Sequence, residues 1–299
     1  MWLFLAIISY FLNSIVSIID KFIVTKKIGN PLVYAFFVGI LSSIAFIVWP
    51  FCFSFLSFWV TIFALFGGIT FFLAVLFLYK AYRRGGVVRA VSIVGGLSPV
   101  LLLALSFVFL HEPKPSFWLL SFALLIAGGL FLAFGQKEKK DQNRNKSKFP
   151  FFAIFSAICF ALSFFFRKIV FLDTSFLNGF LWVQVGVLLS AVVVWFTFPI
   201  RKLVKESTSG VLRKSLVLVV SNKILSAGAF FVLNYSIMLG PVAIINALQG
   251  IQYVFLFLLT YLAYLWYPNF VKESFSRRSV CEKIIGIVLI SLGVVLLTL

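Results

Sequence analysis

A polar segment near the middle of the chain constrains the fold more than any other stretch. Gln136–Lys148, QKEKKDQNRNKSK, contains no apolar side chain, whereas the sequence on both sides is overwhelmingly hydrophobic. Such a segment cannot lie in hydrocarbon, because its charged groups would lose their hydration. It is therefore expected to lie in water as a basic linker (136–148) between two units, residues 1–135 and 149–299.

The composition excludes an ordinary soluble protein. The chain is 63% hydrophobic and 11% charged, with a mean hydropathy of +1.14, whereas soluble domains are roughly 25% charged. A globule of this size could not hide 40 phenylalanines. The sequence therefore predicts an all-α, polytopic membrane protein.

Charges, prolines and turn residues divide the chain into ten expected transmembrane helices, since a helix needs about 20 apolar residues to cross a bilayer. The expected spans cover residues 2–24, 31–49, 58–80, 87–110, 116–135, 149–171, 175–198, 215–238, 241–266 and 284–299.

The two halves repeat one another in three blocks that occur in the same order. Phe4, Ala6, Ile7, Ser9 and Lys21 recur as Phe151, Ala153, Ile154, Ser156 and Lys168; Gly86, Val88, Gly96, Val100 and Leu102 recur as Gly240, Val242, Gly250, Val254 and Leu256; and Leu125, Ile126, Gly129 and Leu132 recur as Leu289, Ile290, Gly293 and Leu296. Five spans per copy is an odd number, so the second copy enters the membrane upside down. The pattern predicts two inverted five-helix repeats, an architecture common in transporters.

The segments 81–112, AYRRGGVVRAVSIVGGLSPVLLLALSFVFLHE, and 124–134, LLIAGGLFLAF, resemble the EamA repeat of the drug/metabolite transporter superfamily, with Pro99, Glu112 and Gly129 at its marker positions. In the second half, 235–259 and 284–297 resemble the second copy. The resemblance implies a secondary transporter of small metabolites in a bacterial or archaeal plasma (inner) membrane, acting as a monomer or homodimer. Relatives move amino acids, nucleotide-type metabolites, drugs and other small molecules.

The connectors between successive spans would lie alternately on the two faces of the membrane, and basic residues are distributed unequally between these faces. One face carries 20 lysines and arginines, including those of Gln136–Lys148, and the other carries Lys114, Arg167 and Lys168. The positive-inside rule then places the central linker in the cytoplasm and both termini outside. The same distribution accounts for the net charge of +18 without nucleic-acid binding, because no soluble surface remains to carry a basic patch.

Polar groups inside a bilayer are costly and therefore mark candidate substrate-binding residues. The first span carries Tyr10, Asn13, Ser17 and Asp20 at helical spacing; the ninth carries Asn246, Gln249 and Tyr253, with Gln252 beside them; and the seventh carries Trp182 and Gln184, which face different ways. Each set could bind a substrate or could instead connect helices by hydrogen bonds. The candidate substrate-binding residues are Asn13, Asp20, Trp182, Lys223, Asn246, Gln249, Gln252 and Tyr253.

Asp20 and Lys223 are an acid and a base placed within spans, at depths that a lysine stem could bridge. The pair, or Lys223 alone, could contact an anionic substrate group or respond to protons during transport. Alternatively, the Asp20 side chain reaches toward the interface and Lys223 binds backbone carbonyls.

The sequence offers no cluster of carboxylates or histidines for acid–base or metal chemistry, so we expect no catalytic site, no metal and no cofactor. Three hypotheses remain. The first is a carrier that moves a small polar or amphipathic metabolite, for example one resembling an amino acid, by alternating access. The second is a membrane-embedded enzyme or lipid-handling subunit, which would need the clustered carboxylates or histidines that are missing. The third is a structural or sensing subunit without transport activity, which would have dry interfaces of small residues.

The predicted orientation can be tested with an impermeant thiol reagent. In a variant lacking Cys52, Cys159 and Cys281, a cysteine replacing Asn143 should be protected in intact cells, because the central linker is expected to be cytoplasmic. A cysteine added at the C-terminus should be labelled. Labelling of the Asn143→Cys variant from outside would reverse the assignment.

Overall fold

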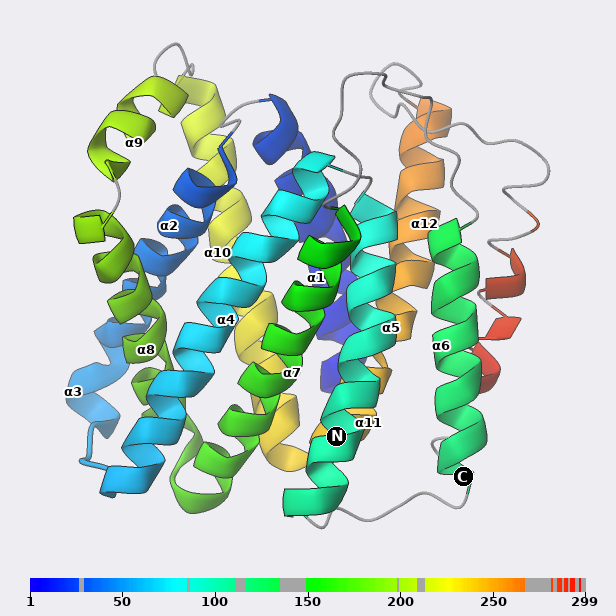
Figure 1. Ribbon diagram of the computed structural model, residues 1–299, viewed down its shortest axis with the longest axis horizontal. Coiled ribbons are helices and arrows are strands. Elements are labelled where there is room, and N and C mark those ends of the chain that lie inside the picture. The colour runs from blue at the N-terminus through cyan, green and yellow to red at the C-terminus, as the bar shows by residue number, and fades with distance from the viewer. Residues whose placement is uncertain are drawn as a thin grey trace.

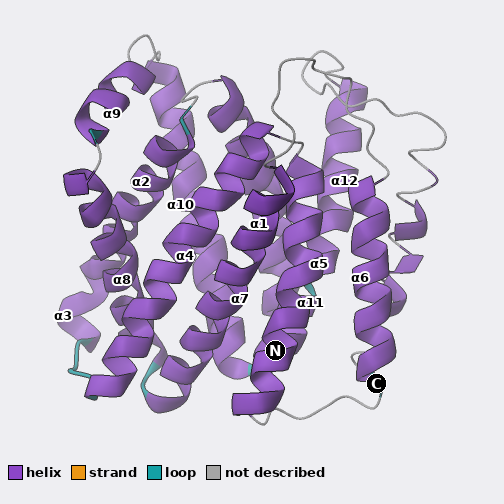
Figure 2. Cartoon of the chain, in the orientation of Figure 1, coloured by secondary structure: helices purple, strands orange, loops and turns teal. Residues whose placement is uncertain are grey.

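The computed structural model describes residues 1–26, 30–84, 87–110, 117–134, 149–197, 199–208 and 213–266, together with 281, 284–286, 288–289, 291–293 and 296 near the C-terminus. All regular secondary structure in these residues is helical (Figure 2). The central linker lies outside the described residues.

The helices follow one another along the chain and stand side by side in Figure 1. In the first half they are α1 (Trp2–Lys26), α2 (Pro31–Leu41), a 3₁₀ stretch (Ser42–Val48), α3 (Trp49–Cys52), α4 (Phe58–Arg84), α5 (Val87–Leu105), a π-helical turn (Ser106–Leu110) and α6 (Trp118–Phe134). In the second half they are α7 (Phe149–Asp173), α8 (Phe176–Thr197), α9 (Ile200–Thr208), α10 (Arg213–Leu239), α11 (Val242–Ala247) and α12 (Gln249–Trp266).

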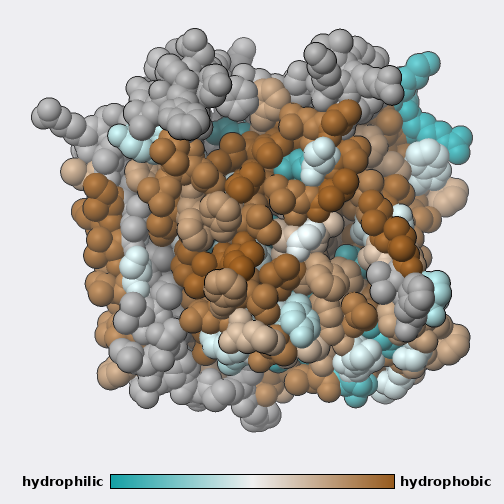
Figure 3. Space-filling view, turned by 180° about the vertical axis from the view of Figure 1, so that it is seen from behind, coloured by the Kyte–Doolittle hydropathy of each residue, from teal (hydrophilic) through white to brown (hydrophobic). Residues whose placement is uncertain are grey.

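Seven helical segments of the described chain are long and apolar enough to cross a membrane: Trp2–Ile23, Phe58–Arg84, Ile93–Leu110, Phe149–Asp173, Phe176–Thr197, Val217–Leu239 and Val242–Leu262. Shorter apolar helices cover Pro31–Ile47, Trp118–Gly128 and Ile284–Gly293. Apolar side chains cover most of the face seen in Figure 3 that is not grey. The protein is a polytopic helical membrane protein, because such a surface requires a lipid environment.

The segment 31–49, expected to form one α-helical span, changes helix type part-way. Helix α2 ends at Leu41 and continues as the 3₁₀ stretch. At this junction the Ser42 and Ser43 hydroxyls donate to the carbonyls of Gly39 and Ile40, at 2.6 and 2.7 Å. Serine side chains that bond back to the preceding turn compete with the helical backbone pattern and bend helices.

The segment 241–266, expected to form another single helix, is interrupted at Leu248 between α11 and α12. The Ile251 N–H donates to the Leu248 carbonyl at 2.9 Å, the shorter-range bond of a tighter turn. The regular α-helical hydrogen-bonding pattern is therefore interrupted at Leu248.

Close packing between α4 and α8 depends on Gly68 and Gly186. A Cβ atom on Gly68 would lie 2.2 Å from the Val183 carbonyl oxygen, and one on Gly186 would lie 2.4 Å from the Leu65 carbonyl oxygen. The absence of a side chain at Gly68 thus permits the close approach of the two helices. Gly96 has no such role, because a Cβ there would meet no described atom within 4 Å.

Gly68→Ala should lower the free energy of unfolding by about 1–3 kcal/mol, because the added methyl group collides with backbone atoms that cannot rotate away. Gly228→Ala in α10 is the matched control, since its Cβ would meet nothing described within 4 Å. That change should be neutral or stabilising by up to about 1 kcal/mol. Unfolding of the detergent-solubilised variants measures both effects, and equal stability of the two would contradict the packing account.

Candidate functional site

A cavity of about 190 Å³ lies between the two halves of the chain. Its wall is built from α1, α2, α4 and α5 of the first half and from α7, α8, α10 and α12 of the second. A single water needs about 10–15 Å³ of such space, so the cavity can hold a small molecule. Its polar lining side chains are Tyr10, Asn13, Ser17, Asp20, Ser42, Tyr79, Tyr82, Gln184, Lys223, Ser226, Gln249 and Gln252.

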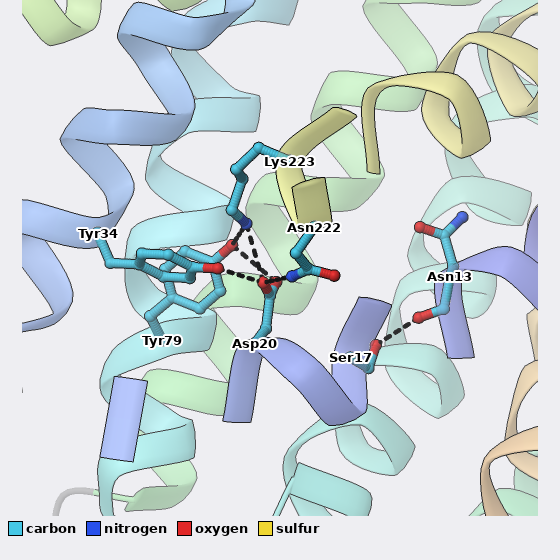
Figure 4. Close-up of polar contacts among 7 residues, drawn as sticks. All are labelled: Asn13, Ser17, Asp20, Tyr34, Tyr79, Asn222 and Lys223. Atoms are coloured by element: carbon cyan, nitrogen blue, oxygen red, sulfur yellow. Dashed lines mark hydrogen bonds and ion pairs between the residues drawn. The ribbon is translucent and has the colours of Figure 1, made fainter. Parts of the chain in front are cut away.

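Asp20 and Lys223 form an ion pair in the cavity wall (Figure 4). The Lys223 Nζ lies 2.9 Å from Asp20 Oδ1, and the two side chains are 5% and 8% exposed. This contact joins α1 to α10 and connects the two halves. The sequence left open whether Asp20 and Lys223 pair or are separate, and the structure shows that they pair.

Three uncharged donors complete the surroundings of the Asp20 carboxylate. Tyr34 and Asn222 donate to Oδ1, the latter at 2.6 Å, and the Tyr79 hydroxyl donates to Oδ2 at 3.0 Å. Lys223 also donates to the Tyr79 hydroxyl at 3.1 Å and lies 4.2 Å from the centre of the Tyr34 ring. Hydrogen bonds of this kind offset the loss of hydration that makes an isolated buried ion pair unfavourable.

The polar stripe on α1 serves partly as a connection between helices and partly as cavity wall. The Tyr10 hydroxyl donates to the Ile245 carbonyl at 2.8 Å, and Gln252 donates to the Ser17 hydroxyl at 3.3 Å. Asn13 lines the cavity and donates to Ser9 on its own helix at 3.1 Å. The stripe therefore connects helices by hydrogen bonds and also faces the cavity.

The remaining predicted site residues separate into two groups. Gln249 and Gln252 line the cavity. Asn246 does not line it, and its side chain instead accepts a hydrogen bond from Ser98 of α5 at 3.2 Å. Trp182 does not line the cavity either.

The Trp182 side chain belongs to a separate contact at one end of α8. Its indole N–H donates to the Ser54 carbonyl at 3.0 Å, and its ring stacks on Phe53. It therefore packs against the segment that follows α3. The Tyr253 side chain lies outside the described part of the structure.

Sequence reasoning missed several side chains that the structure brings to this region. Tyr34, Tyr79 and Asn222 were not singled out, although a tyrosine or an amide within a span is a detectable signal. Gln184 was noticed but not selected; it lines the cavity, and its Oε1 has no hydrogen-bond partner among the described residues.

Arg167 and Lys168 were assigned to a connector at the membrane surface, and this was wrong. Both lie within α7 and are 0% and 8% exposed. Lys168 donates to the carbonyls of Ile237 and Gly240, at 3.0 and 2.8 Å. Its charge therefore caps the C-terminal end of α10, where free carbonyls favour a cation.

The comparisons with known proteins show a fold and nothing more specific. No protein-family model and no curated protein matches the chain. A solved structure described only as "Crystal structure of protein" is similar with a TM-score of 0.61 at 14% sequence identity, covering 97% of this chain and 92% of the other. At this identity the similarity concerns the arrangement of helices alone. Among the described residues, no group of histidine, cysteine or carboxylate side chains could hold a metal.

Asp20→Asn and Lys223→Met should each lower the free energy of unfolding by about 3–5 kcal/mol, because each leaves a buried charge without its partner. The free energy of unfolding of the double variant should fall by less than the sum of the losses in the two single variants. Unfolding of the four proteins in detergent gives the coupling energy. If the two losses simply add, the ion pair does not contribute to the fold.

Proposed function

We propose that this protein is a secondary transporter that moves a small polar or amphipathic metabolite, for example one resembling an amino acid, by alternating access. The observation that carries the proposal is the cavity between the halves, whose wall contains the Asp20–Lys223 pair and the unpartnered Gln184 oxygen. An interface that served only to hold helices together would be filled by side chains, as protein interiors are. Substrate sites of carriers lie between repeats in this way.

We further propose the ten-span architecture with inverted repeats over residues 1–135 and 149–299, joined by the linker 136–148. The pairing of helices supports it, because α1 packs on α10 and α12 while its counterpart α7 packs on α4 and α5. Under the repeat, α4 corresponds to α10, and α5 corresponds to α11 and α12.

The directions of α1 and α7 support the inversion as well. The Ser236 hydroxyl near the end of α10 donates to the carbonyl of Trp2 at the start of α1. The same end of α10 receives Lys168 from the last part of α7. The start of α1 therefore lies beside the end of α7, as expected if the second copy is upside down.

This arrangement agrees with the resemblance of the sequence to the EamA repeat of the drug/metabolite transporter superfamily, and membership of that family is part of the proposal. A central linker in the cytoplasm and both termini outside follow from the distribution of basic residues. A structural, sensing or lipid-handling subunit is the alternative, and no feature of the described cavity favours it.

The transport proposal can be tested in two stages. A thermal-shift screen of the purified protein against a metabolite library should identify compounds that raise its unfolding temperature, because a ligand stabilises the state that binds it. Uptake of the best compound into proteoliposomes then measures transport. A bound compound that is never taken up would favour the sensing alternative.

Gln249→Ala and Lys223→Met should each lower the uptake efficiency about tenfold or more, because each removes a polar group from the cavity wall. Trp182→Phe is the matched control, since Trp182 lies off the cavity wall, and its uptake should match that of the wild type. Wild-type uptake by both cavity variants in folded form would contradict the assignment of the cavity as the transport site.

A further inference from the structure

Arg167 is a fully buried cation that lacks a counter-anion. The buried charged side chains of the described structure are Asp20, Arg167, Lys168 and Lys223. Asp20 pairs with Lys223, and Lys168 binds the carbonyls at the end of α10. Of the two other buried cations, Lys168 is therefore bound by helix-end carbonyls, whereas Arg167 has neither a counter-anion nor such a cap among the described residues.

Neutral groups alone contact the Arg167 guanidinium. Its Nε donates to the Ser163 hydroxyl at 3.2 Å, and one terminal nitrogen donates to Asn234 Oδ1 at 3.0 Å. The other terminal nitrogen, Nη2, is buried and has no acceptor among the described residues. An arginine offers a planar fork that suits a carboxylate or a phosphate, and here part of that fork is unused.

The guanidinium lies next to the wall of the cavity described above. Its central carbon is 5.0 Å from the centre of the Phe71 ring and 4.6 Å from that of Phe230. The two rings are 4.5 Å apart, and both line the cavity. On α7 the lining residues Phe160 and Phe164 precede Arg167 at helical spacing. The two rings thus form the boundary between the cavity and the guanidinium.

The position along α10 separates Arg167 from the ion pair. Asn234, which binds Arg167, follows Lys223 by 11 residues, or roughly 16 Å of helix. The cavity region therefore has the neutralised Asp20–Lys223 pair toward one end of α10 and an unbalanced arginine toward the other.

From these contacts we infer that Arg167 is an anion-binding residue, and that the molecule handled by this cavity carries a carboxylate or phosphate group. The anion reaches the guanidinium when the Phe71 and Phe230 rings move apart, and it then occupies the unused Nη2. A buried arginine without an anion is costly in a membrane protein, and binding of the anion offsets that cost. The inference rests on the proposed transport function for its substrate but concerns a binding event that can be measured alone.

The test uses the purified full chain with defined probes. Unfolding temperatures are measured with inorganic phosphate and with succinate, and with succinamide as an uncharged control. The wild type should be stabilised by the two anions and not by the amide. In Arg167→Gln, which keeps a donor for Asn234 but loses the charge, the anion concentration for half-maximal stabilisation should rise at least about thirtyfold. For Arg167→Lys, the anion concentration for half-maximal stabilisation should lie between the values for the wild type and for Arg167→Gln.

Arg201→Gln is the matched control, because Arg201 is exposed on α9 and its loss removes the same charge from the surface. It should respond to the anions as the wild type does. An equal response in Arg167→Gln, or no response in the wild type, would overturn the inference. Uptake of an uncharged compound through the cavity would also overturn it while leaving the transport proposal intact. Anion binding that requires Arg167, without uptake of any compound, would instead support the inference and count against transport.

Discussion

The ion pair between Asp20 and Lys223 is the interaction on which the arrangement of the two halves depends. It joins α1 to α10 with both charges buried, so its formation requires the correct depth and rotation of both helices at once. Tyr34, Tyr79 and Asn222 surround the carboxylate, which brings α2 and α4 into the same network. A misplaced helix would leave a charge or a donor unpaired in a medium without water, and that cost selects one packing.

Two kinds of contact occur between the helices that line the cavity around this network. Gly68 and Gly186 let the backbones of α4 and α8 touch, which fixes one wall by contacts that have no adjustable side chain. Between Phe71 of α4 and Phe230 of α10 the contact is made by side chains instead of backbone. These bulky rings separate their helices and can change rotamer. The cavity is thus bordered by backbone contacts that cannot adjust and by aromatic side chains that can.

Most of the helical organisation could be predicted from the sequence, because apolar runs and charged connectors record the hydrocarbon boundary directly. The Asp20–Lys223 contact was also within reach, since charges in apolar spans are rare and their depths could be compared. What could not be predicted depends on local backbone geometry. The helix is interrupted at Leu248, and Asn246 binds Ser98 instead of lining the cavity; no proline or charge in the sequence marks that position.

Arg167 and Lys168 show why charge counting in a membrane protein needs the structure. Adjacent helical residues point about 100° apart, so two neighbouring cations of α7 meet different surroundings. Lys168 reaches the free carbonyls at the end of α10, whose partial negative charge balances it. Arg167 instead meets two phenyl rings and neutral acceptors. The first cation is explained by the fold. The second contributes a charge that the described fold does not balance, and a charge kept at that cost is best explained by a ligand of opposite sign.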